Sequence, residues 1–166
     1  MPPPSPRRPL LQRLQDNLPL LVGPALMVGA DVIWLAAHGT SDFEHQALRN
    51  ALVFAVGVGA LIAAFGHTVL RDQVADSIGW PKGSPFQIEV GFANLSYGVV
   101  GVMCAWYTGR FWLAVIVATT VFLLPAAGGH IRDMIKSRNF APGNAGFVFW
   151  WDILLPILLC VLYATQ

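Results

Sequence analysis

The sequence predicts an all-α integral membrane protein, a bundle of about five transmembrane helices with a cytoplasmic N-terminus. Of the 166 residues, 55% are hydrophobic and only 11% are charged, whereas a soluble domain carries about 25% charged residues. The apolar residues gather in five runs of roughly bilayer-spanning length. Basic residues are unevenly shared between the connections on the two sides, which gives the orientation.

Residues 1–17 are predicted to be a disordered or interfacial segment that precedes a single transmembrane domain at 18–166. The first nine residues are rich in proline and arginine, a composition that favours disorder. Leu10, Leu14 and Leu18 then recur at helical spacing, which suggests a short helix at the membrane surface. The following apolar run is too long for a signal-peptide core.

The five predicted spans are the apolar runs 18–37, 51–70, 86–107, 111–128 and 146–163. Each is close to the roughly 20 residues that cross about 30 Å of hydrocarbon. Backbone groups inside a bilayer must pair within their own segment, so we expect α-helices. The absence of a period of two argues against a β-barrel. Polar loops are expected at 38–50, 71–85, 108–110 and 130–144, and the first half of 71–85 could form an interfacial helix.

The orientation follows from the basic residues of the connecting segments. With the N-terminus inside, the outer segments contain only Arg49 and Arg110. The inner segments contain Arg7, Arg8, Arg13, Arg71, Lys82, Arg132, Lys136 and Arg138. Because cytoplasmic loops carry the excess of basic residues, this bias places the N-terminus in the cytoplasm and the C-terminus outside.

A two-hairpin internal repeat is suggested by two similar stretches. The second and fourth spans each end in Gly-His, at His67 and His130, and each is followed by Arg-Asp. The next span carries an acid near its start, Glu89 after His67 and Asp152 after His130. Both acids follow their histidine by 22 residues (89−67 and 152−130). We therefore expect two hairpins, 51–107 and 111–163, related by a parallel repeat.

These four residues are the candidate site, because the topology places His67, Glu89, His130 and Asp152 at the cytoplasmic side. An ionisable group that faces lipid is costly, so these side chains should face the bundle interior. Imidazole and carboxylate together suit a divalent transition metal such as iron, zinc or manganese. The same groups could instead relay protons. A structural interpretation also stays open, because histidines at helix C-termini and acids at N-termini are favoured by the helix dipole.

Two further polar residues lie within the apolar runs. Asn94 is expected to form interhelical hydrogen bonds in the third span. Asp31 lies in the outer half of the first span, and Asn50, Tyr107 or a water-filled cavity could supply its partner. The glycines of the second and third spans are expected to permit close helix packing.

The stretch Gly79–Leu95, GWPKGSPFQIEVGFANL, carries a resemblance as well. It resembles the corresponding motif of a bacterial family of small multi-pass membrane proteins known only as a domain of unknown function. Gly66-His67 and Gly129-His130 fit the same pattern, and the resemblance covers about residues 50–163. It implies a bacterial inner-membrane protein and brings no activity, substrate or cofactor with it.

The functional prediction is therefore an integral membrane protein with a cytoplasm-facing His/carboxylate cluster that binds a metal or small ligand. The alternatives are a proton- or ion-coupled carrier, which would need a homodimer to enclose a path, and a structural or assembly subunit of a membrane complex. The sequence leaves open whether the protein is an enzyme. A net charge of +1 gives no electrostatic case for a nucleic-acid partner. The expected partner is the lipid bilayer.

Overall fold

The computed structural model describes residues 9–15 and 17–166, and within them every regular element is a helix. The first elements are α1 (Leu10–Gln15), the short 3₁₀ turn η1 (Leu18–Leu21) and α2 (Val22–His38). The remaining elements are α3 (Phe43–Asn50), η2 (Ala51–Val58), α4 (Gly59–Thr68), α5 (Arg71–Ile78), α6 (Phe86–Met103), α7 (Arg110–Ser137), α8 (Pro142–Ala145) and α9 (Phe147–Ala164). The predicted all-α fold is confirmed, and the predicted disorder at 1–8 lies outside the described residues.

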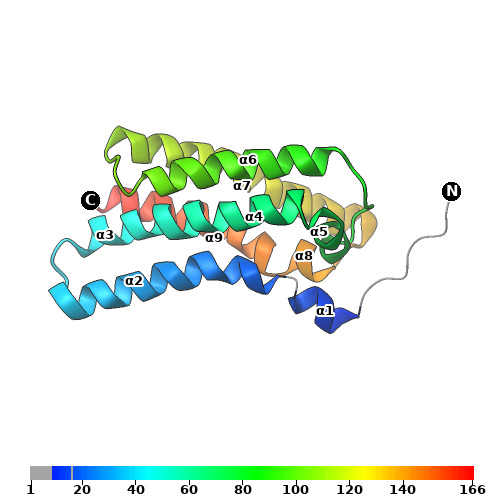
Figure 1. Ribbon diagram of the computed structural model, residues 1–166, viewed down its shortest axis with the longest axis horizontal. Helices are drawn as coiled ribbons and strands as arrows, with labels where there is room; N and C mark the ends of the chain where they lie inside the picture. The colour runs from blue at the N-terminus through cyan, green and yellow to red at the C-terminus, as the bar shows by residue number, and fades with distance from the viewer. Residues whose placement is uncertain (1–8, 16) are drawn as a thin grey trace.

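The long helices lie side by side along the length of the molecule (Figure 1). These are α2, the continuous α3–η2–α4 rod, α6, α7 and α9. The short helices α1, α5 and α8 gather at one end of the bundle, which we call the α5/α8 end. The C-terminus lies at the opposite end (Figure 1), as an odd number of passes along the bundle requires.

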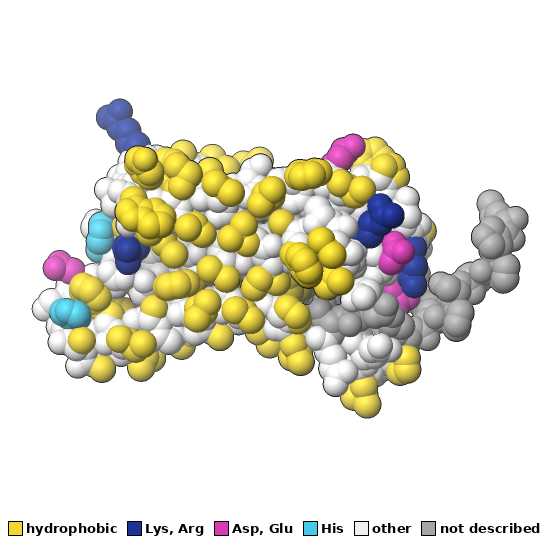
Figure 2. Space-filling model, in the orientation of Figure 1, with side chains coloured by type: hydrophobic (Ala, Val, Ile, Leu, Met, Phe, Trp, Pro, Cys, Tyr) yellow, Lys and Arg dark blue, Asp and Glu magenta, His cyan; other side chains and the backbone are white. Residues whose placement is uncertain are grey.

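Four described segments are long and apolar enough to cross a membrane, with mean hydropathies between 1.9 and 2.2. They are Leu18–His38, Phe43–Thr68, Arg110–Ser137 and Pro142–Ala164. Helix α6 has 18 residues and packs among them, but Gln87, Glu89 and Asn94 make it more polar. The fifth crossing through α6 therefore stays a prediction. Figure 2 shows hydrophobic side chains along the middle of the molecule. Most of the charged side chains that are visible lie at its two ends.

Two predicted loops are wrong in part, because amphipathic helices extend the spans. Residues 43–50 form α3, in which Ala47 and Leu48 are buried while Glu44 and His45 remain exposed. Apolar residues at helical spacing turn this polar stretch into the first turns of the second long helix. Likewise α7 continues to Ser137, which gives a helix of about 42 Å at 1.5 Å per residue, longer than the hydrocarbon core.

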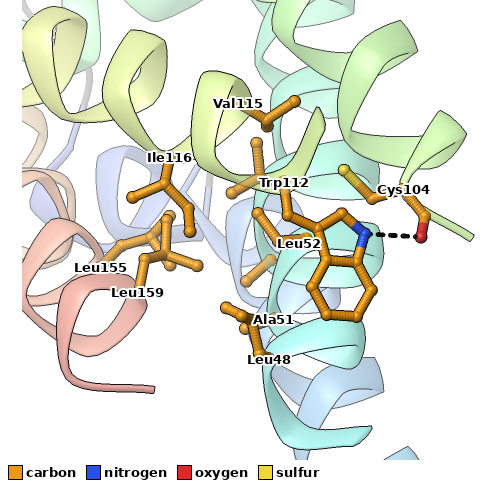
Figure 3. Packing of buried hydrophobic residues seen from close by; sticks show 11 residues of the cluster. Leu48, Ala51, Leu52, Cys104, Trp112, Val115, Ile116, Leu155 and Leu159 are labelled. Atoms are coloured by element: carbon orange, nitrogen blue, oxygen red, sulfur yellow. Dashed lines mark hydrogen bonds between the residues drawn. The ribbon is translucent and has the colours of Figure 1, made fainter. Parts of the chain in front are cut away.

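The apolar core joins η2, α7 and α9 near the C-terminal end of the bundle (Figure 3). Trp112 is 1% exposed, and its indole N–H donates to the Cys104 carbonyl oxygen at 3.0 Å. Around it pack Leu48, Ala51, Leu52, Val115, Ile116, Leu155 and Leu159. Helices in a bilayer gain little from the hydrophobic effect against one another, so this contact stabilises by close packing.

Glycines bring α6 against the second long helix, as expected for packing residues. A Cβ added to Gly101 would lie 2.6 Å from the Cα of Gly57, and one added to Gly98 would lie 2.7 Å from the Leu61 side chain. Such distances are too short for any side chain, so the two backbones touch here. The facing segment η2 is a π-helix, a form that is rare and often found at functional sites.

Candidate functional site

His130 and Asp152 form the candidate site, a buried imidazole–carboxylate pair between α7 and α9. The Nε2 atom of His130 lies 3.6 Å from Oδ2 of Asp152. The two residues are 8% and 6% exposed. An isolated carboxylate buried in this way would be costly, and the imidazole is the partner that compensates it. The structure therefore brings together two of the four predicted site residues.

Asn144 of α8 fixes the proton position on the His130 ring. Its Nδ2 donates to the carbonyl oxygen of Asn139 at 2.8 Å, which can only accept. Its Oδ1 therefore faces Nδ1 of His130, at 2.7 Å, and this ring nitrogen must donate. Because Asn144 is fully buried, no water competes for these bonds. Nε2 is the ring nitrogen that faces Asp152.

Asp133 and Asn139 continue the network towards the surface of the α5/α8 end. Asn139 donates through Nδ2 to the Asp133 carboxylate at 2.6 Å and to the carbonyl of Ile78 at 2.8 Å. Gly79 follows Ile78 with φ of 84°, and a Cβ there would lie 2.7 Å from Oδ1 of Asn139. Only glycine fits both the left-handed conformation and this contact.

Trp80 covers the pair on the side of the network. Its ring stacks on the His130 ring at a centroid distance of 6.3 Å and an interplanar angle of 21°. Its indole N–H donates to Asp133 at 3.0 Å, which holds the ring in this position. Trp80 is itself 49% exposed. Trp80 therefore lies between the surface of the α5/α8 end and the His130 ring that it faces.

His67 and Glu89 do not join this pair. His67 lies next to the last residue of α4, and its Nδ1 is buried with no hydrogen-bond partner among the described residues. Glu89 lies in the first turn of α6 and is exposed. In residues 9–15 and 17–166, no three His, Cys, Asp or Glu side chains are grouped so that they could hold a metal ion. The four predicted ligands are thus not assembled into one metal centre.

The two predicted hairpins also differ at their histidines. His67 ends its helix as expected, because α4 stops at Thr68. The same expectation is wrong for His130, since α7 continues for seven residues to Ser137. After His130 the apolar Ile131, Met134 and Ile135 recur at helical spacing and prolong the helix. This extra length carries Asp133 to the network around Asn139.

Asp31 and Asn94 form hydrogen bonds to residues outside the candidate site. Asp31 accepts a hydrogen bond from Asn50 at 2.7 Å, and Asn50 in turn accepts one from Gln46 at 2.8 Å. Of the partners that the sequence left open for Asp31, the structure shows Asn50. Asn94 donates to the carbonyl of Val90 in its own helix at 2.9 Å, so its described bond lies within α6.

Sequence reasoning missed Trp80, Asp133, Asn139 and Asn144. The stretch 141–144, APGN, indicated a turn. It does not indicate that the asparagines at 139 and 144 face inward, because asparagine is equally common in exposed turns. The only sequence signal is the density of amide and carboxylate side chains on both sides of one turn.

Comparison with known proteins gives one match. Residues 16–166 match a family described as a family of unknown function, DUF6790. No curated protein and no solved structure matches the chain. The family match includes the first apolar run, which the resemblance at residues 50–163 left out. With nearly its whole length matched, the chain belongs to the DUF6790 family of unknown function.

Proposed function

We propose that this chain is a multi-pass protein of the bacterial inner membrane whose His130–Asp152 pair binds and releases a proton, the chemistry of a proton-coupled carrier. The N-terminus is cytoplasmic in this proposal, which puts the pair at the cytoplasmic end of the bundle. The observation that carries the proposal is the isolated, buried contact of 3.6 Å between an imidazole nitrogen and a carboxylate.

The tautomer of His130 determines which atoms of the pair can bind a proton in this proposal. With Nδ1–H held by Asn144, Nε2 faces the Asp152 carboxylate at 3.6 Å, and in this proposal the two groups together carry one proton. If it is on the carboxyl group, both residues are neutral; if it is on Nε2, they form an ion pair. Removal of this proton leaves a lone buried carboxylate, and addition of a second leaves a lone imidazolium. Either change alters the net charge between α7 and α9, and this can drive a change in their packing.

The route for the proton is the network that leads from the surface to His130. Asp133 is only partly buried and accepts a hydrogen bond from the Trp80 indole. Displacement of the Trp80 ring would open His130 to water from this end, because the ring stacks directly on the imidazole. A buried ionisable pair reached through one movable aromatic ring is an arrangement suited to controlled proton entry.

The side chains at the pair favour proton binding over metal binding. Only two groups of the His, Cys, Asp and Glu type meet at the pair among the described residues, whereas a zinc site takes three or four protein ligands. A purely structural tie between α7 and α9 would be served equally by a neutral amide pair. A carrier of this size is expected to act as a homodimer that encloses the path.

The test is infrared difference spectroscopy of the protein in lipid nanodiscs, stepped between about pH 5 and about pH 8, where imidazole pairs titrate. We expect a carboxylic acid C=O band that is lost in Asp152→Asn and shifted in His130→Gln. Asp31→Asn is the matched control, because it removes a hydrogen-bonded carboxylate in the second half of α2, away from the α5/α8 end. It should leave the band of Asp152 unchanged.

Three outcomes would overturn the proposal. The first is a band that survives in folded Asp152→Asn. The second is a His130→Gln spectrum identical to wild type. The third is about one equivalent of a transition metal in the purified protein that is lost in both variants, which would assign the pair to metal binding instead. The same preparation is used for metal analysis by mass spectrometry and for native mass spectrometry, which gives the oligomeric state.

A further inference from the structure

A shallow apolar groove runs between α4 and α6 on the outside of the bundle. Its volume is about 370 Å³, and its walls include Leu61 and Phe65 of α4 and Phe92 and Leu95 of α6. Phe65 and Phe92 are 54% and 59% exposed, so they form raised rims. Gly91 lies on its floor, where a Cβ would meet Thr68 at 2.5 Å. None of the residues that line the groove takes part in the network around His130 and Asp152.

The groove is directed from the polar end of the bundle towards its middle. Thr68 and Gly91 lie at the α5/α8 end, and Leu61 and Leu95 lie deeper. Thr68 follows Leu61 by seven residues, which corresponds to about 10 Å along the helix at 1.5 Å per residue. A bilayer therefore presents acyl chains along the groove and headgroups at its open end.

Arg71 is the first residue of α5 and follows Thr68, which lines the groove, by three residues. Its side chain is 47% exposed, and its contact with the Asp72 carboxylate is long, at 4.0 Å. Its carbonyl accepts a hydrogen bond from Gln87 Nε2 at 2.6 Å, which ties the start of α5 to the start of α6. This bond fixes the backbone of Arg71 three residues beyond Thr68, a residue of the groove wall. Figure 2 shows Lys and Arg side chains beside the hydrophobic surface at this end.

We propose that the groove binds one acyl chain of an anionic phospholipid and that Arg71 binds its phosphate. The guanidinium fork matches a phosphate with two parallel hydrogen bonds. A phospholipid supplies both the apolar tail and the anion at the required separation, whereas a helix from a second copy supplies only apolar side chains. Basic groups on the cytoplasmic side of a membrane protein are also the usual contacts of anionic lipids.

The test is native mass spectrometry of detergent-purified protein incubated with phosphatidylglycerol. Arg71→Gln should retain about ten-fold less lipid, as expected for loss of a charge-assisted bond. Leu95→Trp should fill the groove and abolish retention, while Asp72→Asn should increase it by removing the competing carboxylate. The controls are Arg110→Gln at the other end and Val121→Trp on the exposed face of α7. Both should retain lipid as wild type does.

Equal loss of lipid in Arg71→Gln and Arg110→Gln would overturn the proposal, because it would show unspecific attraction. Full retention in Leu95→Trp, or in Leu95→Ala should the tryptophan variant fail to fold, would exclude the groove. Equal retention of phosphatidylcholine would refute the preference for an anionic lipid. A dimer that is lost in Leu95→Trp without any bound lipid would assign the groove to a second copy of the chain.

Discussion

Substitution of Asn144 by alanine tests whether the polar network at the α5/α8 end holds the helices together. The amide of Asn144 bridges α7 and the segment after it through two hydrogen bonds, at 2.7 Å to His130 and at 2.8 Å to Asn139. Alanine removes both and leaves a buried imidazole N–H and a carbonyl oxygen without their partner. The prediction is a loss of stability larger than that of a typical polar substitution.

The magnitude follows from the burial of the two stranded groups. A buried donor or acceptor left without a partner costs about 1–3 kcal/mol. The Asn139 carbonyl lies in a partly buried contact, so its share should be near the lower limit, while His130 is 8% exposed and carries the larger share. The sum is about 2–4 kcal/mol. For a chain of this size that corresponds to a decrease in Tm of about 5–15 °C.

The measurement is thermal unfolding in one detergent, followed by far-UV circular dichroism and by elution as a monodisperse species. Asn94→Ala is the matched control, since Asn94 is also a buried asparagine, at 9% exposure. Its described bond goes to the Val90 carbonyl, which the helix backbone of α6 also uses. The control should therefore cost about 0.6 kcal/mol, an average for polar contacts within membranes.

Equal losses in the two variants would refute the reasoning, because they would show that the cost depends on burial alone and not on the groups left unpaired. A change of less than about 0.5 kcal/mol in Asn144→Ala, the range of an ordinary surface substitution, would show that the network contributes little to stability.

The remaining predictions concern packing. Gly101→Ala should destabilise by about 1–3 kcal/mol, because its Cβ would lie 2.6 Å from Gly57; Gly29→Ala, with no atom within 4 Å, should be neutral or stabilising in the same unfolding assay. Equal effects at the two glycines would contradict the close contact. Trp112→Phe should cost about 1–3 kcal/mol by stranding the Cys104 carbonyl, and a variant as stable as wild type would show that this bond is dispensable.

The sequence predicts the all-helical and apolar nature of the chain well, because hydropathy is a property of contiguous residues. It fails at 43–50 and at 131–137, where polar residues share a helix with apolar ones. A hydropathy average treats such segments as loops, although their apolar residues are at helical spacing. The boundaries of α3 and α7 are decided by the burial of Ala47 and Leu48 and by the Asn139 network.

The candidate site is predictable only in part, for a similar reason. The internal offset of 22 residues identifies His130 and Asp152 as members of one hairpin, and they do meet. It also suggests that His67 and Glu89 join them, which the structure does not show. Sequence spacing places residues at a depth along a helix but does not give the direction that each side chain faces around it.

The sequence by itself determined an apolar, all-helical chain. It also marked Gly79–Leu95 as a turn followed by a helix with Glu89 in its first turn. Tertiary structure decided that the important residue of the stretch is Trp80, which stacks on His130 and bonds to Asp133. The physical reason is that helix formation depends on local hydrogen bonds and composition, whereas the place of Trp80 depends on contacts with His130 and Asp133, which lie 50 and 53 positions further along the chain.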